Sequence, residues 1–136
     1  GLVAIHDAVR PLVSEELIRA CFNTARIKKS AIPTIDVVDS IRKVKEKNST
    51  VVPRENYQLV QTPQVFHLDK IKTAYKKAAT LMDKNFTDDA SVFEYLFHQV
   101  YLEKGNRENI KITTPIDLHI AAFVLKEREK NKDVCR

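Results

Sequence analysis

The stretch that decides the fold is LVAIHDAVRP, residues 2 to 11. Four apolar residues open it, and His6 and Asp7 follow them directly. A short apolar run without alternation is typical of a strand covered on both faces, as in parallel α/β sheets. Ligands bind at the carboxyl ends of such strands, which would place Asp7 and Arg10 at a site. Alternatively, Asp7 caps the next turn and His6 is a hydrogen-bonded core histidine; this stretch alone leaves both interpretations open.

The composition is that of one folded soluble domain. The chain has 136 residues, 43% of them hydrophobic and 30% charged, which suffices for a single core. It contains no apolar run near the roughly 20 residues of a membrane span, and no signal-peptide pattern opens it. Cys21 falls on an expected apolar helix face and Cys135 in a polar tail, so neither a disulfide framework nor a metal site is predicted. We therefore expect a cytoplasmic protein without membrane contact.

The charge balance is basic, with 23 Lys and Arg against 18 Asp and Glu and a net charge of +5. A basic surface favours anionic partners, either nucleic acid or small phosphates. Lysine-rich helix faces are, however, usually just solvated, and the sequence shows no interleaving of aromatic and basic residues that would stack bases. We expect no nucleic-acid binding.

Glycine is the most informative residue type, because the chain has only Gly1 and Gly105. Nucleotide-using α/β enzymes approach phosphates through a glycine-rich loop. Nothing here can supply one, so either the function is not nucleotide chemistry or a piece is missing. The start of the chain within a strand, without an initiator methionine, favours a missing piece.

Hydrophobic periodicity predicts a layered α/β domain with the order strand, helix, strand, arm, strand, helix, helix, strand, helix. Ser14 is the expected N-cap of the first helix, and an apolar stripe from Leu68 to Met82 indicates the second. Residues 40–52 alternate around a charged turn at 45–49, as a hairpin does. This hairpin is too polar for the core, so we expect an arm that packs on something else.

The last helix has a strong start signal in TTPIDL, residues 113–118. Thr114 is the expected N-cap, with Pro115 at the first helical position. Its expected buried face consists of Leu118, Ala121, Ala122 and Leu125. Residues 126–136 have lost the apolar stripe and are predicted to be a fraying polar tail.

Polar residues cluster at four element ends: His6–Asp7 with Arg10, 61–64, 87–89 and 109–111. Lys111 lies between two isoleucines that we expect to point inward, so its side chain turns the opposite way, just before a helix N-terminus. A lysine there suits an anion. Each cluster also has a plainer interpretation: an exposed edge-strand lysine for Lys111, a turn for 62–63, and a helix cap for 87–88.

Five motifs together resemble one enzyme family, the methylerythritol-phosphate cytidylyltransferases of the non-mevalonate isoprenoid pathway. In chain order they are HDAVRP, DS, QTPQVF, TDDAS and NIKITTPIDL, and the resemblance runs from about Leu2 to Leu125. The sister family that acts on ribitol 5-phosphate is similar in the HD, QTPQ and NIKIT segments. The TDDAS segment favours the isoprenoid enzyme.

The resemblance implies a Rossmann-like nucleotidyltransferase sheet that lacks its N-terminal, nucleotide-binding segment and carries a projecting β-arm. Residues 1–125 would be the C-terminal portion of a single cytidylyltransferase domain, with a dimerisation arm at 40–60. The implied reaction, with Mg²⁺ as cofactor, transfers CMP from CTP to 2-C-methyl-D-erythritol 4-phosphate and releases pyrophosphate. Homodimers would form through the arm. Because the nucleotide-binding segment has no counterpart here, we expect this chain alone to be inactive.

The resemblance also implies site residues. Asp7 and Lys111 match catalytic positions, and Asp7 also lies near the metal. The substrate-binding positions are Ala8, Arg10, Ser40, Arg54, Thr62 and Thr87. Ser40 stands where the family has threonine, and Arg54 matches the arm arginine that reaches the neighbouring subunit's substrate phosphate. Two alternatives stay open, namely a ribitol-5-phosphate cytidylyltransferase and a non-catalytic basic binding module.

Overall fold

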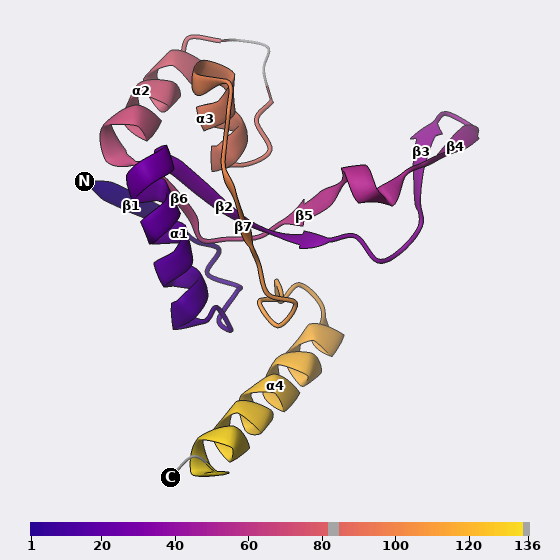
Figure 1. The fold of residues 1–136 in the computed structure, drawn as a ribbon. Coiled ribbons are helices and arrows are strands. Elements are labelled where there is room, and N and C mark those ends of the chain that lie inside the picture. The colour runs from indigo at the N-terminus through magenta and orange to yellow at the C-terminus, as the bar shows by residue number, and fades with distance from the viewer. Residues whose placement is uncertain (82–84, 135–136) are drawn as a thin grey trace.

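The structure is a computed structural model that describes residues 1–81 and 85–134. Helices pack around a small mixed sheet, while a hairpin and the last helix project from it in different directions (Figure 1). The expected layered α/β fold is confirmed. The elements are β1 (Leu2–Ile5), α1 (Glu15–Lys28), β2 (Ser30–Asp36), β3 (Ile41–Lys45), β4 (Asn48–Val52), the 3₁₀ helix η1 (Arg54–Asn56), β5 (Gln58–Val60), β6 (Gln64–His67), α2 (Leu68–Ala78), α3 (Asp89–Phe97), β7 (Leu102–Lys104) and α4 (Pro115–Val134).

Strand β2 is the centre of the sheet. Its first residues pair with β6 and its last with β5, both antiparallel, and β7 pairs with it in parallel. Strands β5 and β6 thus follow one edge of β2 in succession, separated by a turn with a cis Thr62–Pro63 peptide bond. The single strand expected after the arm is therefore two.

Strand β1 lies at an edge of this sheet. Among the described strands it pairs only with β6, antiparallel, with Ile5 opposite Gln64. None of its residues is buried, and Ala4 is exposed. The expectation of a strand covered on both faces is therefore wrong for this chain. The apolar residues of β1 had suggested neighbours on both of its faces. That β1 is an inner strand of a larger sheet stays a prediction.

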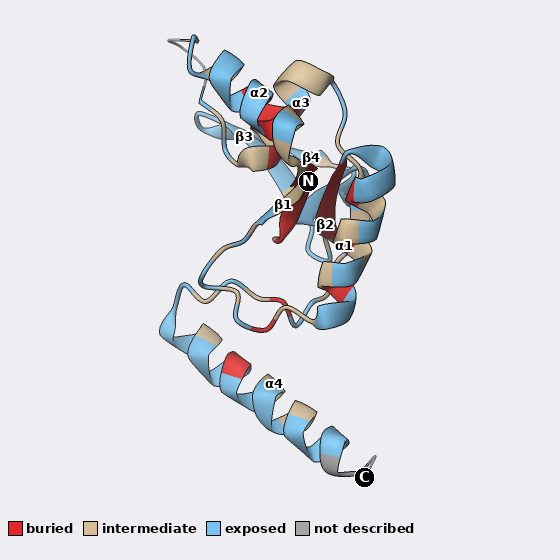
Figure 2. Cartoon of the chain, turned by 90° about the vertical axis from the view of Figure 1, so that its left-hand side faces the viewer, coloured by how far each residue is buried: buried red, intermediate tan, exposed pale blue. Residues whose placement is uncertain are grey.

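Two apolar clusters form the core. Helix α1 packs Leu17, Cys21 and Ala25 against β2 and β6, and the Ser14 side chain accepts a hydrogen bond from Leu17 N–H, as an N-cap does. The second cluster joins α2 and α3 to the sheet around Phe66, which stacks on Phe93 at 5.1 Å between ring centroids. Figure 2 shows the buried residues gathered on the central strands and the helix faces against them. Met82, expected on the stripe of α2, lies outside the described residues.

The hairpin β3–β4 is confirmed and projects from the domain (Figure 1). Its turn is tighter than expected, because Lys45 pairs with Asn48 and only two residues connect the strands. The first of them, Glu46, has a φ of 53°. Nearly all hairpin residues are exposed, apart from the half-buried Ile41 and Val52. The arm thus contributes little to the core.

Helix α4 begins at Pro115, as predicted, with its first turn held by a carboxylate. Asp117 accepts hydrogen bonds from the backbone N–H groups of Thr113 and Thr114, at 2.9 and 2.8 Å. Thr114 thus holds the N-cap position that was predicted, and the side-chain acceptor at this end is Asp117. These backbone bonds, the largest cause, and the Thr114 hydroxyl lower the pKa of Asp117.

The rest of α4 corrects two expectations. Of the face expected to be buried, only Ala121 is; Leu118 and Leu125 are 59% and 49% exposed, and Ala122 is exposed too. The helix also continues to Val134 instead of fraying after residue 125. Arg128 explains this, because it pairs with Glu108 at 2.7 Å and donates to the Leu12 carbonyl at 3.0 Å. Cys135 lies outside the described residues.

In the described ranges, no helix combines the length and the apolar character that crossing a membrane requires.

Candidate active site

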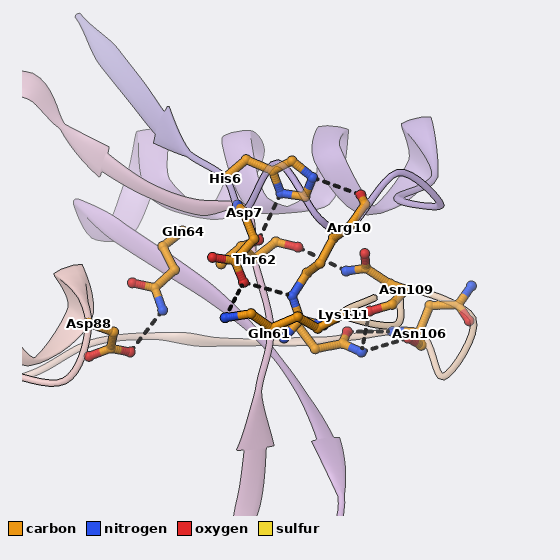
Figure 3. Close-up of polar contacts among 10 residues, drawn as sticks. All are labelled: His6, Asp7, Arg10, Gln61, Thr62, Gln64, Asp88, Asn106, Asn109 and Lys111. Carbon is orange, nitrogen blue, oxygen red and sulfur yellow. Dashed lines mark hydrogen bonds and ion pairs between the residues drawn. The ribbon is translucent and has the colours of Figure 1, made fainter. Parts of the chain in front are cut away.

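A cleft of about 420 Å³ opens where β1 ends. Three segments that are distant in the sequence meet there: the loop after β1, the cis turn between β5 and β6, and the loop before α4 (Figure 3). The start of α3 forms the remaining wall. The lining residues are Asp7, Arg10, Val60, Gln61, Thr62, Gln64, Thr87, Asp88, Asp89 and Lys111. A larger hollow, about 790 Å³, lies over β2, β5 and β7 and contains none of the predicted site residues.

Asp7 is the centre of the cleft's charges. Its Oδ2 accepts a hydrogen bond from Arg10 Nε at 3.1 Å and lies 3.4 Å from Lys111 Nζ. Partial burial by itself raises the pKa of the Asp7 carboxyl, but the Arg10 hydrogen bond and the Lys111 charge outweigh it, so the pKa lies below its ordinary value. Asp7 is therefore a carboxylate at neutral pH, with two cations beside it.

Buried amide side chains support the loop whose backbone binds Arg10. Its Nη1 donates to the carbonyl of Asn109 at 2.7 Å, and Asn109 Nδ2 donates to the carbonyl of Thr62 at 2.8 Å. Gln61 Nε2 donates to the carbonyls of Asn106 at 2.8 Å and Asn109 at 3.3 Å. Because Gln61 and Asn109 are only 3% and 1% exposed, these bonds form in surroundings where an unpaired amide would be costly. They fix the loop before α4 to the cis turn.

His6 and Thr62 connect the same turn to β1. Thr62 Oγ1 accepts from the Asp7 backbone N–H at 3.0 Å and lies 2.8 Å from His6 Nδ1, while His6 Nε2 lies 3.0 Å from the Arg10 carbonyl oxygen. His6 is exposed, so the interpretation of a core histidine is wrong, although both ring nitrogens are hydrogen-bonded. The interpretation that Asp7 caps the next turn holds for its backbone, because its carbonyl closes that turn with Arg10 N–H. Its carboxylate instead contacts Arg10 Nε and Lys111 Nζ.

The opposite wall is the N-terminus of α3. Asp88 caps this helix, accepting from Ser91 N–H at 2.9 Å, and its other oxygen accepts from Gln64 Nε2 at 2.9 Å. Gln64 Oε1 in turn accepts from Ala90 N–H. The helix-cap interpretation of residues 87–88 is therefore confirmed. Thr87 and Asp88 nevertheless also line the cleft.

The structure brings five of the eight predicted site residues into the cleft: Asp7, Arg10, Thr62, Thr87 and Lys111. Ala8 is exposed in the turn next to Asp7 and does not line it. Ser40 and Arg54 lie at the base of the arm instead, where the Arg54 guanidinium donates to the Val38 carbonyl. No described contact joins them to Asp7.

Lys111 reaches Asp7 from a loop, so the plainer interpretation of an edge-strand lysine is wrong. The loop is held in place by Ile112 N–H, which donates to the Val9 carbonyl at 2.8 Å. The Lys111 side chain is half exposed, with its Nζ at the Asp7 carboxylate. An ammonium group so placed remains accessible to a ligand.

Four polar residues at element ends, Gln61, Gln64, Asp88 and Asn109, line or support the cleft although the motifs assigned them no role in the site. For the three amides among them a signal was available, because an amide beside apolar residues must find partners once it is buried. What the sequence could not show is which carbonyls they would meet, because those partners belong to distant segments.

The residues present suit a magnesium ion that binds together with a substrate phosphate. Across residues 1–81 and 85–134, no three His, Cys, Asp or Glu side chains are grouped as a metal site would need. Mg²⁺ commonly binds through one or two carboxylates plus substrate phosphates and water. Asp7, ionised and lining the cleft, fits that mode.

Comparisons with known proteins point to one family. The family model "IspD: 2-C-methyl-D-erythritol 4-phosphate cytidylyltransferase" matches residues 1–127. A curated relative of that name from Bacteroides fragilis is 54% identical over 125 residues, covering 92% of this chain and 56% of the relative. One from Halalkalibacterium halodurans is 41% identical over 131 residues, covering 96% and 57%.

Solved structures agree as well. The 2-C-methyl-D-erythritol 4-phosphate cytidylyltransferase of Thermus thermophilus superposes with a TM-score of 0.83 at 33% identity, covering 92% of this chain and 62% of that one. The 4-diphosphocytidyl-2C-methyl-D-erythritol synthase of Anaerococcus prevotii gives 0.83 at 32%, covering 92% and 58%. The chain thus spans little more than half the length of the curated relatives it matches. The chain belongs to the 2-C-methyl-D-erythritol 4-phosphate cytidylyltransferase family.

Proposed function

We propose that this chain is the C-terminal portion of an enzyme that transfers CMP from CTP to 2-C-methyl-D-erythritol 4-phosphate and releases pyrophosphate. The observation that carries the proposal is the cleft in which Arg10 and Lys111 both contact the Asp7 carboxylate, within a segment that matches the family from residue 1 to 127. The same match favours methylerythritol phosphate over ribitol phosphate as substrate.

The proposed chemistry is an in-line displacement. An oxygen of the polyol phosphate attacks the α-phosphorus of CTP, the new P–O bond forms, and the bond to pyrophosphate breaks. Such a transfer needs positioned positive charge more than covalent help. Lys111 and Arg10 provide that charge at the cleft, and Asp7 orients both. Bound Mg²⁺ would neutralise phosphate charge, with Asp7 as its protein ligand.

The arm residues fit the proposal only with a second subunit. Arg54 and Ser40 lie away from the cleft of their own chain, at the base of the exposed hairpin. We propose a homodimer in which the 40–60 arm of each chain brings Arg54 and Ser40 to the partner's polyol phosphate. This dimer and a cytoplasmic location both remain predictions.

Two observations test the proposal. The first is the gene sequence upstream of the Gly1 codon, where we expect an in-frame glycine-rich segment with an arginine and a lysine. The second is CTP-dependent pyrophosphate release, expected from the complete protein, absent from its Asp7→Asn variant, and absent from the 136-residue chain alone. A stop codon directly upstream, or turnover by the isolated chain, would contradict the assignment as a portion of the enzyme.

The alternative of a basic binding module would be supported by a different result. It requires tight binding of nucleic acid that weakens steeply with salt, without any pyrophosphate release by the complete protein.

A further inference from the structure

The Thr62 hydroxyl, which lines the cleft, contacts two hydrogen-bonding groups. Its oxygen is 3.0 Å from the Asp7 backbone nitrogen and 2.8 Å from His6 Nδ1. The other ring nitrogen of His6 is 3.0 Å from the carbonyl oxygen of Arg10. Figure 3 shows His6 next to Thr62 and Arg10, on the side away from Gln64 and Asp88.

The chemistry of these groups fixes the direction of each bond. A carbonyl oxygen only accepts, so His6 Nε2 must carry the proton that bonds the Arg10 carbonyl. In the neutral ring Nδ1 then has no proton and can only accept. The donor to Nδ1 must be the Thr62 O–H. The Asp7 N–H can only donate, so it uses one of the two lone pairs of Thr62 Oγ1.

We infer that His6 is a positioning residue that turns the Thr62 hydroxyl proton away from the cleft, so that Thr62 meets a ligand as a hydrogen-bond acceptor. The Thr62 hydroxyl donates its proton to His6 Nδ1 and accepts from the Asp7 N–H with one lone pair. Its second lone pair stays free, on a side chain that lines the cleft. A dianionic phosphate offers only acceptors and gains nothing from it. A polyol hydroxyl can donate to it.

This inference rests on the proposed function only for the identity of the ligand, a polyol phosphate. The cleft separates two tasks: the cations Arg10 and Lys111 suit the phosphate, while Thr62 suits the hydroxyls of the carbon chain. The substrate-binding role predicted for Thr62 thereby becomes specific, namely recognition of the polyol part of the substrate.

The first test reads the hydrogen bond itself and needs no substrate. In the ¹⁵N-labelled 136-residue chain at pH 8, ring ¹⁵N spectra should show His6 protonated at Nε2, with Nδ1 shifted as for an acceptor. Thr62→Val, which keeps the shape but removes the hydroxyl, should move the Nδ1 resonance toward that of a free acceptor nitrogen. Thr62→Ser should leave it nearly unchanged, and so should Thr80→Val in the turn after α2.

An His6 ring protonated at Nδ1, or a Nδ1 resonance that ignores Thr62→Val, would overturn the inference. Dispersed backbone spectra of each variant show that it has folded. This readout is independent of catalysis, so it can fail while the proposed function stands.

The second test uses two probes with different hydrogen-bonding capacity. Thr62→Val should weaken binding of 2-C-methyl-D-erythritol 4-phosphate by roughly three- to tenfold, the effect of one ordinary hydrogen bond. It should leave the binding of inorganic phosphate unchanged. Equal losses for both probes would mean that Thr62 donates to phosphate, and the inference would be wrong. If inorganic phosphate binds and the polyol phosphate binds no more tightly, the proposed substrate is wrong, while the ring spectra still decide the His6 bond.

Discussion

Lys111 and Asp7, which come from the two ends of the family-matching segment, meet with Lys111 Nζ 3.4 Å from Asp7 Oδ2. The same oxygen already accepts from Arg10 Nε. Two positive charges therefore share one negative charge, and the group as a whole is cationic. This group offers a local positive charge to a phosphate and keeps Asp7 ionised, while Asp88 and Asp89 put negative charge on the opposite wall.

Removing the Lys111 charge should disable the enzyme without unfolding it. In the complete protein we expect Lys111→Met to lower kcat by about 10²–10³-fold, the usual cost of losing one group that stabilises developing charge. Lys72→Met, on the exposed side of α2, is the matched control and should keep the wild-type rate. Steady-state pyrophosphate release measures both. A Lys111→Met enzyme with unchanged kcat and KM would exclude Lys111 from the chemistry.

Asp7 should also make the free energy of unfolding depend on pH in the acid range. Its pKa in the folded chain lies below the ordinary 3.8, because Arg10 and Lys111 favour the carboxylate. The stability from this shift is complete above pH 3.8 and is lost as the pH falls through the folded pKa. Urea unfolding of wild type and Asp7→Asn should therefore show a difference that is constant from pH 7 to about 5 and shrinks below pH 3.8. A difference that does not change with pH would mean that the Asp7 ion pairs contribute no stability.

Any side chain at position 105 should disturb the local packing. A Cβ there would lie 2.5 Å from Gln61 Oε1 and 2.9 Å from the Thr34 carbonyl oxygen. Since the carbonyl cannot move without disturbing β2, we expect Gly105→Ala to destabilise the chain by about 1–3 kcal/mol. Gly1→Ala, with nothing within 4 Å of the added carbon, should have little effect. Equal unfolding midpoints for both variants would show that the loop relaxes freely.

The arm predicts complementation between subunits. If Arg54 acts in the partner's cleft, a heterodimer of Asp7→Asn and Arg54→Ala subunits has one cleft with both native residues. Randomly mixed subunits of the complete protein should then recover about a quarter of wild-type activity, because half of the dimers are mixed and each has one intact site. Each variant alone should be nearly inactive. No recovery after verified subunit exchange would place Arg54 outside the partner's site.

Local sequence signals located most of the elements. Ser14, Asp88 and Pro115 mark helix starts that the structure confirms, because caps and first-turn residues act through neighbours in the chain. The surroundings of β1 and the exposure of α4 could not be predicted. Apolar character shows that a face needs cover but not what supplies it.

The sequence allowed most of the residues of the cleft to be predicted, but not how they are arranged. The motifs pointed to Asp7, Arg10, Thr62, Thr87 and Lys111, which do meet. The amides that hold them in place went unassigned, since the carbonyls that Gln61 and Asn109 bind lie in other segments. Ser40 and Arg54 remain apart because no contact within one chain brings the arm to the cleft.

The hydrogen bond from Arg128 to the Leu12 carbonyl has a consequence for biogenesis. A ribosome releases the N-terminal part of a chain first, so the loop with Asp7 and Arg10 emerges long before the helix that ties it down. Contacts between such distant positions form slowly, because the intervening chain must first be ordered. The hydrogen bond that ties Arg128 to the segment after this loop therefore cannot form until residue 128 has left the ribosome.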